Sequence, residues 1–343
     1  MEVMKQIQTG EFSIVELLKT IELKCGQTYL LKLADGNILE SGDVFMAREQ
    51  GYGTRPYKFE DFENPSDTEK RVMTVCTMAG CSCSCKFCAS RNSFKRNLTA
   101  QEIVGQVDRM IEEGILRGRN SDPNNSKEFR VLYTRMGEPM LNIDNVIESI
   151  KMLIKRYPHI IIGMSTSGFK TGLDKLLENP EIVPYLDFQF SLHSTSDVER
   201  DYLFGIKAGN NKVSISDIGE YVDKMYAITK KKISLNVILF KGYTYDFKEL
   251  AKTIDKNKIW IRLSPWNLVT DSESEYDFQG LLKLEDVIAK KPVSGAELEK
   301  VINDLDELGI AYAYAPAIDE EIKNNVACGQ ALEAFKKEVL TTA

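Results

Sequence analysis

The most informative feature of the chain is Cys81-Ser-Cys-Ser-Cys85-Lys-Phe-Cys88, which spaces three cysteines as Cys-x3-Cys-x2-Cys. Three thiolates can hold three irons of a cubic [4Fe–4S] cluster and leave the fourth iron without a protein ligand. An iron that is open in this way can bind a substrate or a cofactor. The spacing therefore predicts a reactive iron–sulfur centre with Cys81, Cys85 and Cys88 as its metal ligands.

A structural zinc site is the alternative interpretation of these cysteines. Zinc prefers four ligands, usually as two pairs separated by a dozen or more residues. Here the thiols lie within eight residues, and the two histidines of the chain, His159 and His193, are not at finger spacing. Cys83 could complete a local set of four, but the alternating Cys81, Cys83 and Cys85 would make a poor tetrahedron. The spacing favours the cluster.

The composition is that of an ordinary globular protein. The 343 residues are enough for one large α/β domain or two smaller ones. No apolar run is as long as a membrane span, and the first residues do not form a signal peptide. We therefore expect a cytoplasmic protein whose seven cysteines serve metal binding or catalysis rather than disulfides. The net charge of −7 argues against strong nonspecific nucleic-acid binding and leaves room for a local basic patch.

From residue 71 onward, apolar β-branched runs alternate with amphipathic helical runs, one of which opens with the capping box Thr99-Ala-Gln-Glu102. This alternation predicts an α/β fold with a parallel sheet and right-handed crossovers. Its length suits a partial (β/α)6 barrel with the active site at the carboxyl ends of the strands. The expected strands are 71–76, 129–134, 159–165, 186–192, 232–239, 259–264 and 310–314.

The first 70 residues differ and are predicted to form a small N-terminal extension to a barrel that comprises residues 71–343. A helix is expected within 10–23, and a hairpin pairs 27–33 with 37–40 across Asp35-Gly36. Residues 41–69 are polar and rich in turn formers, which predicts an exposed excursion. Residues 271–292 form a second segment of this kind.

Seven further motifs complete the pattern. In chain order they are Phe94-Lys-Arg-Asn-Leu98, Glu102-Ile-Val-Gly-Gln-Val107, Met136-Gly-Glu-Pro139, Ser165-Thr-Ser-Gly168, Ser191-Leu-His193, Pro265-Trp-Asn267 and Ala327-Cys-Gly-Gln330. With the cysteine loop, this series resembles the radical S-adenosylmethionine (SAM) RNA adenine methyltransferases. That family includes the dual-specificity ribosomal and transfer RNA adenine-C2 enzymes and the chloramphenicol–florfenicol resistance adenine-C8 enzymes. The resemblance covers roughly residues 28–40 and 71–332.

The resemblance implies a [4Fe–4S] cluster and SAM as cofactors. In the family the open iron chelates SAM, and an electron from a donor such as flavodoxin or ferredoxin cleaves SAM to a 5′-deoxyadenosyl radical. Glu138 would accept hydrogen bonds from the SAM ammonium, and Gly137 would let the backbone approach closely. Strand-end capping remains an alternative role for the two serines, and a core position for His193. The implied cofactor-binding residues are Phe87, Gly137, Glu138, Ser165, Ser191, His193 and Asn267.

Cys328 matches the methyl carrier of the family, although a lone cysteine is more often a small buried hydrophobe. An aromatic carbon of adenine is a poor nucleophile, so direct polar methyl transfer from SAM fails. The resemblance implies that one SAM methylates Cys328 and that a second SAM supplies the radical that activates the S-methyl group. The resulting carbon radical adds to the ring and leaves a thioether-linked adduct.

Release of the adduct requires another thiol, which attacks the thioether and forms a transient disulfide. The family has this cysteine seven residues before the first cluster cysteine, where this chain has Thr74. We assign the role to Cys76, because the preceding strand aligns if two residues are deleted from the loop. A buried strand cysteine is the alternative. Glu40 in Leu39-Glu-Ser matches a family carboxylate with a catalytic role.

The substrate half of the chain departs from the family. The N-terminal module that the family uses with RNA is largely absent, and acidic residues at 319–321 stand where the family is rich in arginine. RNA adenine is the leading substrate by resemblance. The same chemistry on a small aromatic molecule or a peptide is the first alternative, and a noncatalytic metal-binding protein is the second. The remaining basic candidates are Lys86, Arg91, Lys95 and Arg96.

Overall fold

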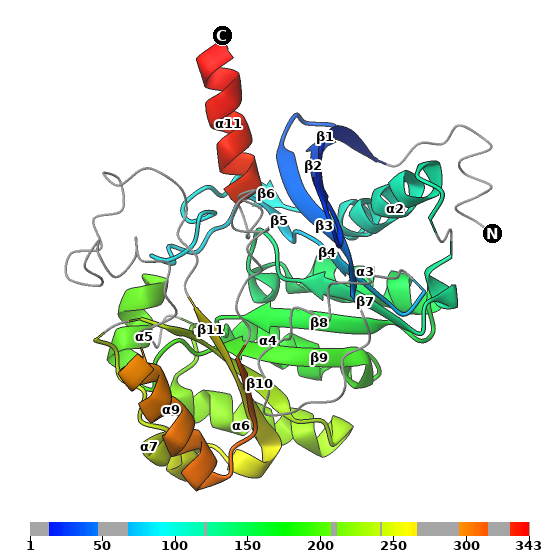
Figure 1. Ribbon diagram of the computed structural model, residues 1–343. Coiled ribbons are helices and arrows are strands. Elements are labelled where there is room, and N and C mark those ends of the chain that lie inside the picture. Colours follow the sequence, from blue (N-terminus) through cyan, green and yellow to red (C-terminus); the bar gives the residue numbers. More distant parts are fainter. Residues whose placement is uncertain are drawn as a thin grey trace.

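The computed structural model describes residues 14–46, 68–119, 122–206, 211–240, 242–265, 295–314 and 330–342. Its centre is a ten-stranded sheet in the order β1-β2-β3-β4-β7-β8-β9-β10-β11-β12, shown in Figure 1. The strands are β1 (Val15–Leu23), β2 (Gly26–Leu33), β3 (Ile38–Met46), β4 (Lys70–Thr74), β7 (Glu128–Tyr133), β8 (Ile161–Thr166), β9 (Leu186–Ser191), β10 (Ile233–Leu239), β11 (Ile259–Pro265) and β12 (Tyr312–Tyr314).

All strands from β4 to β12 in this sheet run parallel to their neighbours. Helices connect them, as right-handed crossovers require, and α2 packs on α3 while α7 packs on α6 and α9. The predicted parallel α/β architecture is therefore confirmed, with every predicted strand present and its ends shifted by a few residues. The helices are α2 (Ala100–Leu116), α3 (Ile143–Arg156), α4 (Lys170–Leu177), α5 (Asp197–Phe204), α6 (Ile215–Thr229), α7 (Phe247–Thr253), α9 (Gly295–Leu308) and α11 (Gln330–Thr342).

The predicted capping box of α2 is present. Thr99 accepts a hydrogen bond from the amide of Glu102, and the Glu102 side chain accepts from the amide of Thr99. The apolar stripe of this helix, which includes Ile103 and Val107, is buried. The periodicity of the sequence predicts this helix correctly because its apolar face and its cap agree with the packing.

The predicted helix within 10–23 is wrong. Val15–Leu23 is strand β1 and pairs antiparallel with β2, while residues 10–13 lie outside the described part of the chain. A register shift between Leu17 and Lys19 inserts an extra residue into the strand. Such a bulge interrupts the period of two, so that Ile14, Leu17, Leu18 and Ile21 fall at helical spacing although the segment is extended. Tertiary pairing thus overrides the local pattern.

The predicted hairpin over Asp35-Gly36 is confirmed, but its second strand is longer than expected. β3 continues to Met46 and pairs antiparallel with β4, so residues 41–46 are not an exposed excursion. The prediction failed because polar residues of this segment are buried and paired: Asp43 makes a buried ion pair of 2.7 Å with Arg71. The described part of the N-terminal extension therefore shares one sheet with the barrel. Residues 47–67 and 271–292 lie outside the described residues.

The carboxyl ends of the parallel strands meet at one edge of the sheet. The cysteine loop follows β4 there, next to the short ribbon of β5 (Met78–Ala79) and β6 (Arg96–Asn97). The C-terminal helix α11, red in Figure 1, contacts β2 and β3. Within the described residues, no helix is both long and apolar enough to cross a bilayer.

Candidate active site at the carboxyl edge of the sheet

The cysteine loop is folded compactly against the end of β4. Gly80, with φ +78°, lies against the backbone of Ser93, where an added Cβ would come within 2.1 Å of the carbonyl oxygen. The hydroxyl of Ser93 in turn accepts a hydrogen bond from the amide of Cys81, at 3.2 Å. The amide of Cys88 donates to the carbonyl of Cys85, at 3.1 Å. These contacts turn the loop back on itself.

The thiols of the loop affect one another's pKa values. A hydrogen bond with Cys83 raises the pKa of Cys81, and burial raises the pKa of Cys88 to about 11, with Cys81 adding to the effect. Four soft thiol donors on one loop suit an iron–sulfur cluster far better than a hard cation. In the described part of the chain, no three His, Cys, Asp or Glu side chains gather as ligands of a single ion.

Phe87 joins the cysteine loop to the ends of two other strands. Its ring packs edge-on against His193, with 4.8 Å between the ring centroids, and it also contacts Phe204 and Phe240. The amide of Lys86 donates to the carbonyl of Leu203 at 2.8 Å. The loop that resembles the family's cluster loop is therefore anchored to the β9–α5 connection.

His193 is a buried, neutral histidine. Burial, assisted by the positive charge of Arg200, lowers its pKa to about 3. Its Nδ1 accepts a hydrogen bond from the amide of Ile238 at 3.1 Å, which assigns the proton of the neutral ring to Nε2. The backbone of His193 has φ +60°, an uncommon conformation for a residue with a side chain. The Ser191-Leu-His193 motif is thus a tight turn that presses the imidazole against the cysteine loop.

Glu138 is buried and accepts hydrogen bonds at both carboxylate oxygens. Oε1 accepts from the amide of Met140 at 3.1 Å and from the hydroxyl of Thr166. Oε2 accepts from the amide and the hydroxyl of Ser167, at 2.9 and 2.7 Å. Burial raises the pKa of this carboxyl, while these hydrogen bonds oppose the shift. Glu138 therefore ties the Met136-Gly-Glu-Pro139 turn to the Ser165-Thr-Ser-Gly168 turn.

Gly137 permits a close approach of its turn to Thr77 and Met78. It has φ +109°, and an added Cβ would lie 2.4 Å from the hydroxyl oxygen of Thr77 and 2.8 Å from the amide nitrogen of Met78. The carbonyl of Met136 accepts a hydrogen bond from the amide of Thr77 at 2.9 Å. The turn after β7 thus lies directly against the chain that enters the cysteine loop.

Ser165 and Ser191 lie side by side on neighbouring strands. Their hydroxyl oxygens are 3.4 Å apart, and the side-chain amide of Gln189 donates to Ser165 at 3.0 Å. The structure thereby brings the serines to the same edge as Gly137, Glu138 and His193. Asn267 and Cys328 lie outside the described residues.

Glu40 and Cys76 are in direct contact. The thiol of Cys76 donates to the backbone carbonyl of Glu40, with 3.0 Å between sulfur and oxygen, and both side chains are fully buried. Burial raises the pKa of Cys76 to about 12. The side chain of Gln106 bonds to both the amide and the carbonyl of Cys76, at 2.8 and 3.0 Å. The two residues that we assigned from the family thus meet at the end of β4.

Arg135 is a residue of this site that the sequence reasoning missed. Its guanidinium donates to Oε1 of Glu40 at 2.6 Å and to the hydroxyl of Thr74 at 2.9 Å. The other oxygen of Glu40 accepts from the amide of Leu332 in α11, at 3.2 Å. The position of Arg135 immediately before the Met136-Gly-Glu-Pro139 motif was the available signal, because it lies just beyond a predicted strand end.

The basic candidates near the loop do not form an open cationic patch. Arg96 is held by Asp35 at 2.5 Å and by Glu102 at 2.7 Å. The ammonium of Lys86 lies over the ring of Tyr202, 4.5 Å from its centroid. Arg91 donates to the carbonyl of Lys86 at 3.3 Å. At least three of the four side chains are therefore engaged with other parts of the protein.

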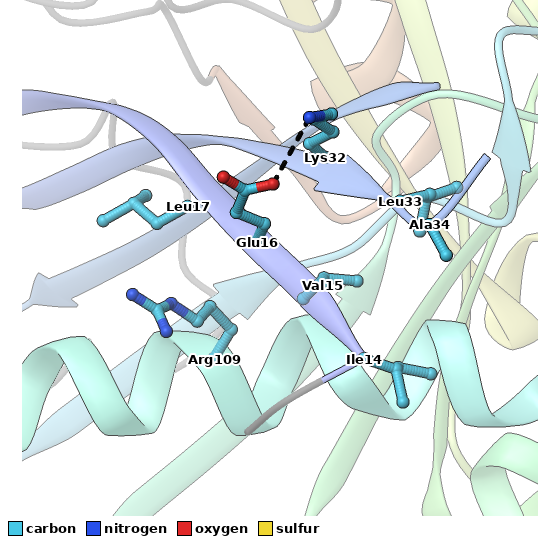
Figure 2. A pocket seen from close by; sticks show the side chains of 8 residues that line it. All are labelled: Ile14, Val15, Glu16, Leu17, Lys32, Leu33, Ala34 and Arg109. Atoms are coloured by element: carbon cyan, nitrogen blue, oxygen red, sulfur yellow. Dashed lines mark ion pairs between the residues drawn. The ribbon is translucent and has the colours of Figure 1, made fainter. Parts of the chain in front are cut away.

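A separate cavity of about 300 Å³ lies between β1, the end of β2 and α2, as shown in Figure 2. An ion pair of 3.4 Å joins Glu16 to Lys32 on its wall. The cavity shares no residue with the site described above. Its lining residues are Ile14, Val15, Glu16, Leu17, Lys32, Leu33, Ala34 and Arg109.

Comparison with known sequences finds relatives that are named as dual-specificity RNA methyltransferases. A probable dual-specificity RNA methyltransferase RlmN of Pseudothermotoga lettingae is 31% identical over 247 residues, which are 70% of this chain and 61% of the relative. Its counterpart in Heliobacterium modesticaldum is 32% identical over 253 residues, 71% of this chain and 58% of the relative. The chain thus spans less than two thirds of the length of these two relatives. No protein-family model matches the chain.

A third relative is matched over more of its length. The probable dual-specificity RNA methyltransferase RlmN of Thermosipho melanesiensis is 27% identical over 312 residues, which are 87% of this chain and 80% of the relative. Among solved structures, a radical SAM methyltransferase from Sphaerobacter thermophilus superposes with a TM-score of 0.68 at 19% identity. The superposition covers 93% of this chain and 81% of that one, which confirms the predicted fold class.

Proposed function

Because the chain is a divergent member of the radical-SAM RNA methyltransferase family, we propose that it transfers a methyl group from SAM to an sp² carbon. An RNA adenine, methylated at C2 or C8, is the leading substrate, because the relatives are named as RNA methyltransferases. We propose two SAM molecules per turnover and an S-methylcysteine intermediate. A cytoplasmic location, where thiols stay reduced, suits this chemistry.

In this proposal Cys81, Cys85 and Cys88 hold a [4Fe–4S] cluster. When bound, the cluster supplies the electron, received from a flavodoxin or ferredoxin, for reductive cleavage of SAM. Gly137 opens room for SAM at the turn after β7, and Glu138 fixes that turn against the Ser165 turn. Ser165, Ser191, His193 and Asn267 line the SAM site, and the Phe87 ring closes it on the side of the cysteine loop.

Cys328 is the proposed methyl carrier, and the contact between Glu40 and α11 supports this role. Leu332, whose amide donates to Glu40, comes four residues after Cys328. Cys76 is the proposed second thiol. It removes the ring proton and then attacks the sulfur of the thioether, so that a transient disulfide with Cys328 forms, the bond between sulfur and the transferred carbon breaks, and that carbon takes up a proton to become the methyl group. Glu40, which lies next to Cys76, is proposed as a catalytic carboxylate in this release step.

The observation that carries the proposal is the convergence of the motifs on one edge of the sheet. The turns after β4, β7, β8 and β9 contact one another through Phe87, Gly137, Glu138 and His193. The test is an anaerobic reaction with methyl-labelled SAM and either total cell RNA or a small-molecule extract. Label in the adenosine that nuclease digestion releases from the RNA would support RNA methylation. Unlabelled adenosine from a reaction in which the enzyme cleaves SAM would contradict it.

A different substrate for the same chemistry is the second candidate. Two observations favour it. The acidic segment at 319–321 would repel RNA phosphates. Arg96 is already engaged in ion pairs within the protein and is therefore not available to bind them. Label in a small aromatic molecule or in a peptide would support this candidate. A noncatalytic metal-binding protein is separated from both by its failure to cleave SAM when iron and sulfide are bound.

A further inference from the structure

We propose that Arg135 is a positioning residue that holds the C-terminal helix α11 at the active-site edge by fixing Glu40. The inference rests on the proposed function only for its consequence, the placement of Cys328 for methyl loading. The contacts themselves concern residues that the structure describes. Arg135 lies just outside the motif Met136-Gly-Glu-Pro139.

The side chain of Arg135 crosses from the end of β7 to two neighbouring strands. Its Nη1 lies 2.6 Å from Oε1 of Glu40 in β3, and its Nε lies 2.9 Å from the hydroxyl of Thr74 at the end of β4. The side chain of Glu40 is 0% exposed and that of Arg135 is 11% exposed. A buried pair of charges that also makes hydrogen bonds to third groups has a defined geometry.

The niche that receives the guanidinium is built by the backbone. Gly42 stands opposite Thr74 in the register of β3 and β4. A Cβ at Gly42 would lie 2.8 Å from Nη2 of Arg135 and 2.9 Å from the hydroxyl oxygen of Thr74. Any larger residue at position 42 would displace the arginine. The glycine in the middle of a strand, normally a weak choice, thus leaves the space that Arg135 fills.

Glu40 connects this niche to α11. Its Oε2 accepts from the amide of Leu332, the third residue of the helix, at 3.2 Å. A carboxylate in this place satisfies one of the amides that the first turn of a helix leaves unpaired and opposes the positive end of the helix. Since Arg135 holds Oε1, it directs Oε2 at the helix. Arg135 thereby acts on α11 through Glu40.

The same geometry explains the residue at position 74. The resemblance places the second thiol of the family there, but here Thr74 provides a hydroxyl that accepts from Arg135. In this chain position 74 therefore serves to hold the arginine, and the arginine serves to hold Glu40 against the helix that follows Ala327-Cys-Gly-Gln330.

Hydrogen–deuterium exchange of the full-length protein with its cluster tests the proposal. Arg135→Met should raise the exchange rate of the amides at 330–334 at least tenfold, while Arg135→Lys, which keeps the charge, should raise it less than threefold. Arg130→Met is the matched control. Arg130 lies in β7, the strand that precedes Arg135, but its ion pair of 2.7 Å is with Asp187 in β9 and not with Glu40. It should leave the exchange of α11 unchanged.

A second variant covers the case in which Arg135→Met does not fold because Glu40 is left as an uncompensated buried charge. Glu40→Gln/Arg135→Met removes both charges and should loosen α11 to the same extent. Unchanged exchange at 330–334 in either variant, or equal loosening by Arg130→Met, would overturn the proposal.

Methyl loading separates this inference from the proposed function. Mass spectrometry of the Cys328 peptide should show at least a fivefold loss of methyl in Arg135→Met and partial recovery in Arg135→Lys, at equal iron content. If wild-type Cys328 carries no methyl group while α11 loosens as expected, the proposed function fails and the role of Arg135 in holding the helix stands. If wild-type Cys328 is methylated and α11 does not loosen, the role of Arg135 fails alone.

Discussion

At the scale of single residues, the active-site edge combines groups that the sequence identifies with groups that only the folded chain connects. Glu138 and Gly137 were predicted as a turn that SAM approaches, and the structure adds that Glu138 bridges two turns through Thr166 and Ser167. Arg135 could not be predicted in this way. Its partners lie 95 and 61 residues away in the chain, and their proximity depends on the sheet order.

Cys76→Ala is predicted to stall the reaction after addition to the substrate. Methylation of Cys328 should proceed, but without a second thiol the thioether cannot be attacked. The expected product is a covalent protein–substrate species that resists thiol reductants and whose mass falls on nuclease digestion if RNA is attached. Intact-protein mass spectrometry measures it. Normal turnover by Cys76→Ala would refute the assignment of the second thiol to Cys76.

His193 should make stability depend on pH in the acidic range. Its pKa is about 3 in the folded protein because burial disfavours the charged ring, against 6.5 for an ordinary histidine. The unfolded chain therefore binds the proton first, so stability is complete above pH 6.5 and falls as the pH decreases toward 3. The loss from this group approaches about 1.4 kcal/mol per pH unit.

The measurement is the free energy of unfolding in urea between pH 7 and pH 4.5. His193→Asn, which keeps an acceptor for the amide of Ile238, should flatten the slope relative to wild type. His159→Asn changes an exposed histidine and should leave the slope as it is. A slope that is identical in His193→Asn and wild type would contradict the buried neutral state.

At the scale of elements, the parallel strands and α2 were predictable because their periodicity, caps and burial agree. β1 was not, since its bulge between Leu17 and Lys19 produces helical spacing in an extended strand. β3 was predicted too short because Glu40, Ser41 and Asp43 are polar residues that the fold buries and pairs. Local patterns thus failed where long-range partners determine the conformation.

The turn between β7 and α3 provides a test at this scale. Gly137→Ala should destabilise the protein by at least about 2 kcal/mol more than Gly118→Ala, because both glycines have positive φ but only Gly137 meets other atoms. At Gly118, with φ +73°, an added Cβ has no atom within 4 Å. Urea unfolding of the two variants gives the difference. Equal costs would mean that the close approach of the turn to Thr77 contributes nothing.

At the scale of the whole molecule, the cysteine loop and the C-terminal helix α11 both contact strands that are distant in sequence. Phe87 joins the loop to the β9 and β10 ends, while the amide of Leu332 joins α11 to β3. A bound cluster should therefore stabilise contacts across the sheet. Anaerobic reconstitution should raise both the iron content and the Tm of wild type and of Cys83→Ala. It should raise neither in Cys81→Ala, Cys85→Ala or Cys88→Ala. A Cys83→Ala protein without iron would contradict the ligand assignment.

The proposed function depends most on Cys328, which we propose carries the methyl group from SAM to an sp² carbon. Its most direct test is mass spectrometry of the peptide that contains Cys328, from protein isolated with an intact cluster and then exposed to methyl-labelled SAM. We expect one methyl group on the sulfur of Cys328 and the same label in the product after turnover. Active enzyme in which Cys328 stays unmodified, or turnover by Cys328→Ala, would contradict it.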